Sequence, residues 1–261
     1  LSSEGLFQAN LKYVRALYDT YGEPMVSVAP ADGYVTLCQC DLCKGKGTPE
    51  RGWTGQLSDY VWGYVDRVAR ELYRTHPDRK VNCIAYGAYL LPPEKIATLS
   101  PNIAVVICRW RSSFHDAATR EQFARLTQAW REKLPSREVY IWDYYLHSRP
   151  GGPTEGVPVY FPHLIADDLR ALKGISGGDF IEVYRNWAPD KLPWEALAAN
   201  HLNVYVTSRL YWGADQDVDA LLAEYYALFY GPARQEMKAL VEYAEANWMK
   251  ATTEVAVIDR L

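Results

Sequence analysis

Short apolar runs alternate with amphipathic stretches along the first 190 residues. Five runs have the composition of buried parallel strands, and they cover residues 25–29, 81–85, 103–108, 139–142 and 180–183. Stretches with the 3.6-residue spacing of an amphipathic helix lie among them, at residues 57–73, 120–133 and 164–172. This alternation predicts parallel β-α-β units.

The pattern changes after the fifth run. Three helices are predicted at residues 194–212, 218–230 and 233–248. Asp217 has the residue type and the position of an N-cap for the second helix. Pro232 is expected in the first turn of the third helix. The last third of the chain is therefore predicted to be helical.

The predicted fold is α/β, a (β/α)8 TIM-type barrel. A complete barrel needs eight strands, and only five are found before the chain turns helical. We therefore expect the chain to hold about the last five β/α units, with an N-terminal part of the same protein missing from it. The expected domains are a partial-barrel catalytic domain at residues 1–190 and a C-terminal helical segment at residues 191–261, packed on the barrel.

The composition of the chain limits the kinds of molecule that it is expected to bind. Hydrophobic residues make up 49% of the chain, which is typical of a globular protein. The formal net charge of −4 and the lack of a basic stripe argue against nucleic acid. No apolar run reaches the roughly 18 residues of a membrane-spanning helix. The chain is rich in Tyr and Trp, with 20 and 9 residues, and these side chains suit sugar faces as well as protein cores.

Chemically useful side chains follow every predicted strand. In a parallel barrel the C-terminal strand ends form the active-site face, and here they supply the carboxyl groups of Asp32, Asp143 and Glu182. Cleavage of a glycosidic bond uses such a pair of carboxyls. Glu182 ends a short apolar strand, and the Asp32-Gly33 step allows a tight turn, so these two are predicted to be catalytic. A structural ion pair with an arginine is the alternative role for any one of the three.

The remaining strand-end residues are predicted to bind the substrate. Tryptophans would stack on sugar rings, while Arg109, Arg111 and Arg185 would meet a uronic or sialic carboxylate. The predicted substrate-binding residues are Asp143, Trp142, Tyr144, His147, Tyr86, Arg109, Trp110, Tyr184, Arg185 and Trp187.

Three cysteines form a CxCxxC motif after the first strand. Cys38, Cys40 and Cys43 lie within six residues and have the spacing of thiolate ligands for a structural zinc ion, with a fourth ligand from elsewhere. Alternatively, two of them form a local disulfide if the protein is exported. Either arrangement would brace the loop after Asp32. Cys83 and Cys108 lie inside predicted strands and are expected in the core.

Several segments together resemble a known family. They are residues 26–34, the CxCxxC motif, residues 57–62, 86–93 and 142–144, and the tail segments 202–205, 210–212 and 230–233. They are similar to the uncharacterised central domain of large bacterial carbohydrate-active proteins, related to α-glucuronidase-like and β-hexosaminidase-like glycoside hydrolases. Some members are endo-β-N-acetylglucosaminidases. One departure is Ala31, where many members have Asn before Asp-Gly.

The resemblance implies a secreted or periplasmic enzyme that degrades glycans, and it places Asp32 and Glu182 at matching motif positions. The leading hypothesis is a glycoside hydrolase that acts on an oligo- or polysaccharide and needs no cofactor for catalysis. The first alternative is a non-catalytic carbohydrate-binding module. The second is a zinc-dependent hydrolase that uses the cysteines, although three thiolates without a nearby His favour a structural metal site.

Overall fold

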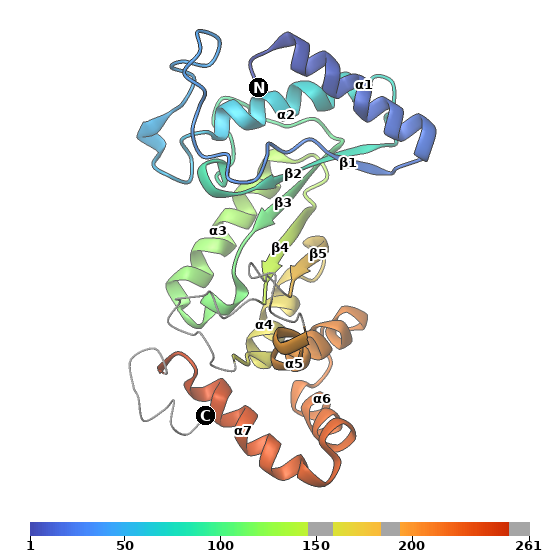
Figure 1. Ribbon diagram of the computed structural model, residues 1–261, viewed down its shortest axis with the longest axis vertical. Coiled ribbons are helices and arrows are strands. Elements are labelled where there is room, and N and C mark those ends of the chain that lie inside the picture. The colour runs from blue at the N-terminus through green and yellow to red at the C-terminus, as the bar shows by residue number, and fades with distance from the viewer. Residues whose placement is uncertain (146–158, 184–193, 251–261) are drawn as a thin grey trace. The chain divides into compact units, whose positions relative to one another are not determined.

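The computed structural model describes residues 1–145, 159–183 and 194–250 (Figure 1). The chain divides into two compact units. Unit 1 comprises Leu1–Arg109, Ala118–Trp142 and Ile175–Phe180, and unit 2 comprises Trp110–Ala117, Asp143–Gly174 and Ile181–Leu261. No helix in the described ranges is both long enough and apolar enough to cross a membrane.

The strands form one five-stranded sheet in the order β1-β2-β3-β4-β5. The strands are β1 (Met25–Ser27), β2 (Lys80–Ala85), β3 (Ile103–Cys108), β4 (Val139–Tyr144) and β5 (Ser176–Glu182). The register pairs Val26 with Val81, Val81 with Ile103 and Ile107 with Ile141, and these three strand pairs are parallel. Every residue of β3 is buried, as its continuous apolar sequence predicts. All five predicted strands are therefore present.

The prediction of a (β/α)8 TIM-type barrel is wrong. Within the described residues the sheet is open, because β1 and β5 are its edges and do not pair with each other. A barrel of this type closes only with about eight tilted strands. The alternation of strands and helices specifies local β-α-β units, and these units build an open sheet as readily as a closed one. The fold is an α/β arrangement on five strands.

Three α-helices belong largely to unit 1: α1 (Glu4–Tyr21), α2 (Ser58–Tyr73) and α3 (Ala117–Lys133). The sequence analysis missed α1, although its signals are clear. The Ser3 side chain caps its first turn, Gly22 ends it in the left-handed conformation with a φ of 69°, and Phe7, Leu11, Val14 and Tyr18 line its buried face. Helices α1 and α2 lie side by side (Figure 1).

Two buried tryptophans anchor the turn that follows β2. The rings of Trp62 and Trp130 lie 4.5 Å apart between centroids, and both side chains are fully buried. Their indole N–H groups donate to adjacent carbonyls, that of Trp62 to Tyr89 at 3.0 Å and that of Trp130 to Leu90 at 2.9 Å. The short 3-10 helix η2 (Gly87–Tyr89) is thereby held against α2 and α3. A second 3-10 turn, η1 (Pro49–Arg51), precedes α2.

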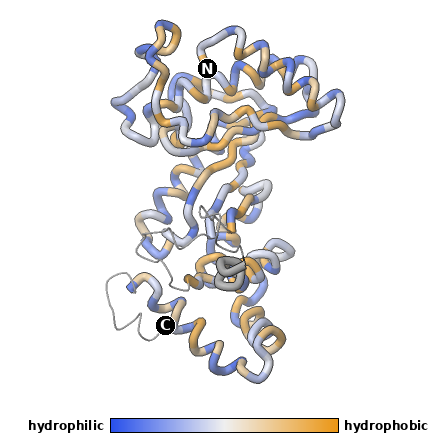
Figure 2. Tube along the Cα trace, in the orientation of Figure 1, coloured by the Kyte–Doolittle hydropathy of each residue, from blue (hydrophilic) through white to orange (hydrophobic). Residues whose placement is uncertain are grey.

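Unit 2 is mainly helical, and the three helices predicted after residue 190 lie in it. It contains η3 (Arg111–His115), α4 (Pro162–Leu172), α5 (Trp194–Trp212), α6 (Val218–Tyr225), the π-helical turn η4 (Tyr226–Tyr230), η5 (Gly231–Ala233) and α7 (Arg234–Asn247). The predicted cap of α6 is confirmed, because Asp217 accepts hydrogen bonds from the backbone of Asp219 and Ala220. Pro232 lies in the 3-10 turn just before α7. Hydrophobic segments alternate with polar ones along these helices (Figure 2), and their buried sides pack into one core.

Candidate functional site

Two aromatic rings are stacked where β3 and β4 end. The rings of Trp110 and Tyr144 have centroids 4.4 Å apart and an interplanar angle of 21°. Both side chains are half-buried, so the pair is partly accessible. Both residues were predicted to bind substrate, and the structure brings them together.

The Asp143 carboxylate holds the backbone of this pair. Asp143 is fully buried. Its Oδ1 atom accepts hydrogen bonds from the backbone N–H of Arg111 at 2.9 Å and of Tyr144 at 2.7 Å. One oxygen thus fixes the residue after Trp110 and the residue that carries the second ring. This arrangement favours a positioning role for Asp143.

Arg111 lies at the centre of a buried ion-pair network. Its guanidinium contacts Asp143 Oδ2 at 3.1 Å and Asp168 Oδ2 at 2.6 Å, and it donates to the Tyr145 hydroxyl at 2.7 Å. The Arg111 side chain has no exposed surface. The expectation that Arg111 meets a substrate carboxylate is therefore wrong, because two carboxylates of the protein already hold it.

A directional chain of hydrogen bonds continues from Arg111 into α5. The Tyr145 hydroxyl lies 2.7 Å from Thr207 Oγ1, and Thr207 donates its proton to the backbone carbonyl of Asn203 at 2.7 Å. Since the Thr207 proton is used there, Tyr145 donates to Thr207. Burial raises the pKa of Tyr145 to about 12, and the neighbouring Asp143 charge acts in the same direction, while Arg111 opposes it. The phenol therefore remains a neutral donor.

The Asn203 side chain extends the same network. Its Oδ1 accepts from the backbone N–H of Phe161 at 3.2 Å, and its Nδ2 donates to the carbonyl of Val159 at 2.9 Å. The sequence analysis missed Asp168, Asn203 and Thr207. The spacing of Asn203 and Thr207, two polar residues four apart in an apolar helix, was the signal available for two of them.

Glu182 ends β5 and is half-buried. Its backbone carbonyl accepts a hydrogen bond from the backbone N–H of Tyr145 at 3.0 Å. Glu182 therefore lies on the strand end adjacent to the segment that carries Asp143, Tyr144 and Tyr145. The predicted residues Glu182, Asp143, Tyr144 and Trp110 all belong to unit 2.

The predicted residue Asp32 belongs to unit 1. It is exposed, and its Oδ1 accepts from the backbone N–H of Gly33 at 2.8 Å. Gly33 has a φ of 73°, so this tight turn depends on glycine. Burial is the main cause of the raised pKa of Tyr89, and the charge of Asp32 acts in the same direction.

Three further predicted residues lie in unit 1. Tyr86 is half-buried directly after β2, and Arg109 is buried, with its backbone N–H donating to the carbonyl of Trp142 at 2.9 Å. The Trp142 ring packs on Phe180 with a centroid distance of 4.1 Å. Its Nε1 atom is buried and has no hydrogen-bond partner within the described part of the chain. His147, Tyr184, Arg185 and Trp187 lie outside the described residues.

The three cysteines of the CxCxxC motif converge. The Sγ atoms of Cys38, Cys40 and Cys43 all lie within 4.8 Å of one another, so this cluster could bind a metal ion. Cys43 is buried, and its Sγ lies 3.4 Å from the hydroxyl of Tyr60 on α2. The pKa of Cys43 falls to about 6, first because of this hydrogen bond and then because of one with Ser2.

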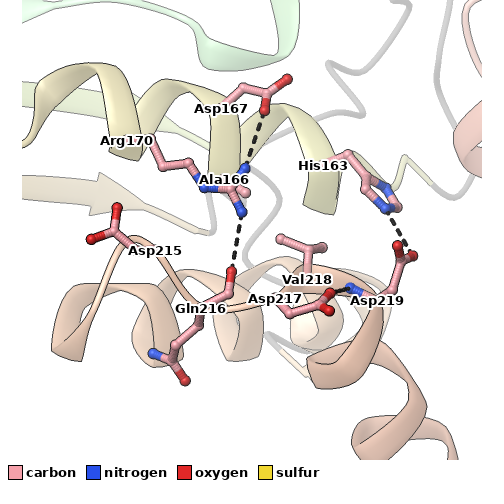
Figure 3. A pocket seen from close by; sticks show the side chains of 9 residues that line it. All are labelled: His163, Ala166, Asp167, Arg170, Asp215, Gln216, Asp217, Val218 and Asp219. Carbon is pink, nitrogen blue, oxygen red and sulfur yellow. Dashed lines mark hydrogen bonds and ion pairs between the residues drawn. The ribbon is translucent and has the colours of Figure 1, made fainter.

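A separate hollow of about 260 Å³ lies in unit 2, among polar side chains (Figure 3). His163 on α4 faces Asp219, with Nε2 to Oδ1 at 3.3 Å, and its Nδ1 lies 2.9 Å from Glu245 Oε2. Arg170 contacts Asp167 and donates to the carbonyls of Ala214 and Gln216. The pKa of His163 rises to about 9, chiefly through its bond to Glu245. The charged groups that line this hollow thus already have partners within the protein.

Comparison with known proteins gives one match. A family model described as "Domain of unknown function (DUF4838)" matches residues 1–241. No curated protein and no solved structure matches the chain.

Proposed function

The chain belongs to the DUF4838 family, a domain of unknown function, and we propose that it is a glycoside hydrolase that uses Glu182 and Asp32 as its paired carboxyls. The observation that carries this proposal is the arrangement of the strand ends in unit 2. There, Glu182 lies beside a segment whose aromatic pair, Trp110 and Tyr144, is held in place by the buried Asp143.

This arrangement has the properties that a sugar site needs. A sugar ring presents an apolar face and hydroxyl edges, so it binds where aromatic surface and polar groups occur together. A useful site also needs side chains that are already ordered before the ligand arrives. Trp110 and Tyr144 provide the aromatic surface. The hydrogen bonds and ion pairs of Asp143 and Arg111 hold the backbone of this pair in place before a ligand binds.

The three acidic residues have different proposed roles. The pairing of Glu182 with Asp32 at one glycosidic bond, one as the acid and the other as the base or nucleophile, is proposed from the sequence alone. Asp143 is a positioning residue, because its oxygens bind Arg111 and the backbone of Tyr144. The proposed catalytic part is residues 1–190. A secreted or periplasmic location in bacteria, and glycans as the substrate, are proposed from the sequence resemblance alone.

The cysteine cluster has no part in this chemistry. Cleavage by two carboxyls needs no metal, so we propose that any ion at Cys38, Cys40 and Cys43 is structural. A zinc-dependent hydrolase would instead lose its activity on exhaustive chelation.

The proposal is tested with Glu182→Gln in the full chain, assayed on a panel of aryl glycosides and N-glycans. We expect turnover by the wild type to fall at least about 100-fold, in line with the loss of general acid–base catalysis. Glu138→Gln is the matched control, because Glu138 lies at the other end of β4, next to Lys80. That variant should retain activity, and equal turnover by the wild type and Glu182→Gln would refute the role of Glu182.

The aromatic pair also favours the second candidate, a carbohydrate-binding module without catalysis. That function predicts saccharide affinity in both the wild type and Glu182→Gln, with turnover in neither. Affinity should then fall in Trp110→Ala, since Trp110 contributes half of the stacked pair.

A further inference from the structure

The loop that carries the CxCxxC motif is folded by its own backbone. The N–H groups of Cys43 and Lys44 both donate to the carbonyl of Cys40 at 2.9 Å, which closes a tight turn. The backbone N–H of Cys40 also points at Cys38 Sγ, at 3.4 Å. Two cysteines of the motif, Cys38 and Cys40, are exposed, whereas Cys43 is buried against α2.

The distances between the sulfurs fit a single metal ion. A tetrahedral zinc ion with Zn–S bonds of about 2.3 Å holds its sulfur ligands roughly 3.8 Å apart. In the structure all three Sγ atoms lie within 4.8 Å of one another, so small side-chain rotations suffice. An iron–sulfur cluster is a poorer fit, since its four thiolates are divided among two or four iron atoms and those on different irons lie farther apart.

A disulfide explains the geometry less well. A disulfide joins two sulfurs at about 2.05 Å and leaves the third without a function. Here the third sulfur lies close to the other two, and two hydrogen-bond donors already face the three sulfur atoms. These donors are the Cys40 N–H, directed at Cys38, and the Tyr60 hydroxyl, beside Cys43. Thiolates bound to a metal commonly accept such hydrogen bonds from surrounding groups.

From these observations we infer that Cys38, Cys40 and Cys43 bind one zinc ion through three thiolates. The exposed Cys38 and Cys40 leave the remaining position of the ion accessible to a fourth ligand. Binding releases the protons of those cysteines that are thiols. The neighbouring Lys44 and Lys46 offset the net negative charge of a zinc ion with three thiolates.

The inferred site explains how a polar loop is ordered. The metal would join the exposed turn at Cys38 and Cys40 to Cys43, which contacts Tyr60 and so anchors the loop to α2. The same loop begins just after the Asp32-Gly33 turn. This inference does not depend on the glycosidase proposal, because a structural ion is compatible with any activity.

The test is the metal content of the full chain, purified without added metal and measured by mass spectrometry. We expect about one zinc per chain, as for a mononuclear site. Cys38→Ser, Cys40→Ser and Cys43→Ser should each lower this content strongly, while Cys108→Ala should not. Circular dichroism shows whether each variant is folded. Replacement of zinc by cobalt should add visible thiolate absorption that the same three variants lose.

Thiol titration in denaturant separates the other outcomes. The inferred site predicts five reactive thiols once zinc is chelated, because the chain has five cysteines. Three reactive thiols and a mapped bond between two of the motif cysteines would establish a disulfide and overturn the inference. Five thiols in a folded protein that neither carries nor takes up zinc would overturn it as well, as would iron with acid-labile sulfide.

Discussion

The loop after β1 and the segments after β3 and β4 carry similar kinds of residue but are ordered in different ways. After β1, Asp32 and two of the three motif cysteines are exposed, and most of the hydrogen bonds are between near neighbours in the sequence. At the ends of β3 and β4, Arg111 and Asp143 are fully buried and bond to each other. Arg111 also bonds to Asp168 on α4, and Tyr145 bonds to Thr207 on α5.

The difference shows two ways to fix polar side chains at a strand end. In unit 2 the buried charged side chains bind residues that are distant in the sequence. Their arrangement therefore forms as the unit folds. In the loop after β1 the partners are few, and the convergent sulfurs could bind an external ion that would complete the structure. Replacement of single residues should therefore have large effects in the first region, and metal removal should affect the second.

The largest expected effect follows from Arg111→Met. This change removes the Arg111 guanidinium from beside the buried Asp143 and Asp168 carboxylates, so we expect the free energy of unfolding to fall by about 3–5 kcal/mol in urea titrations. Lys238→Met is the control, because Lys238 forms an exposed pair with Glu242 and should change stability by less than about 1 kcal/mol. Adding Asp168→Asn to Arg111→Met should recover part of the loss. A loss as small as that of the control would show that the network contributes little.

A smaller effect is expected from Thr207→Val. The substitution preserves shape but removes the acceptor of the Tyr145 proton, and a buried donor without a partner costs about 1–3 kcal/mol. Ser208→Ala, the next residue along α5, removes an exposed hydroxyl and should change stability by less than about 0.5 kcal/mol. Similar values for the two variants would contradict the directional chain described above.

The smallest effect concerns the half-exposed ion pairs of His163, which face Glu245 from α7 and Asp219 from α6. Because the pKa of His163 is raised from 6.5 to about 9, its stabilisation is fully present below about pH 6.5 and is lost as the pH rises through 9. Solvent screening keeps it below about 1 kcal/mol. The stability advantage of the wild type over His163→Gln should shrink between pH 6 and pH 10, and an advantage that stays constant over this range would contradict the prediction.

Local patterns predicted most of the elements. The continuous apolar run of β3 and the helical spacing of apolar residues in α2 were sufficient to predict these two elements. Both patterns follow from which side chains are buried. Helix α1 was missed although Ser3, Gly22 and its apolar face mark it clearly. Closure of the sheet was predicted wrongly, since nothing in a single strand records which other strand it will pair with.

The candidate site was predicted only in part. Trp110, Tyr144 and Glu182 were identified from their positions after strands, and the structure places all three in unit 2. The role of Arg111 was not predictable in this way, because its partners Asp168 and Tyr145 come from distant segments. An arginine at a strand end has the same sequence signature whether it faces a ligand or a buried carboxylate.

The hydrogen bonds of Asn203 and Thr207 have a consequence for the rotation of α5 about its own axis. This helix has apolar residues on more than one side, with Leu202, Val206 and Leu210 buried and Trp212 almost fully exposed, so hydrophobic burial alone orients it weakly. A slip of one residue would turn each side chain by about 100°. It would separate Thr207 from Tyr145 and Asn203 from the 159–161 backbone at the same time. The hydrogen bonds of these two polar residues thus fix the rotation of α5 about its axis. Without them, several rotations of this largely apolar helix would bury similar hydrophobic surface.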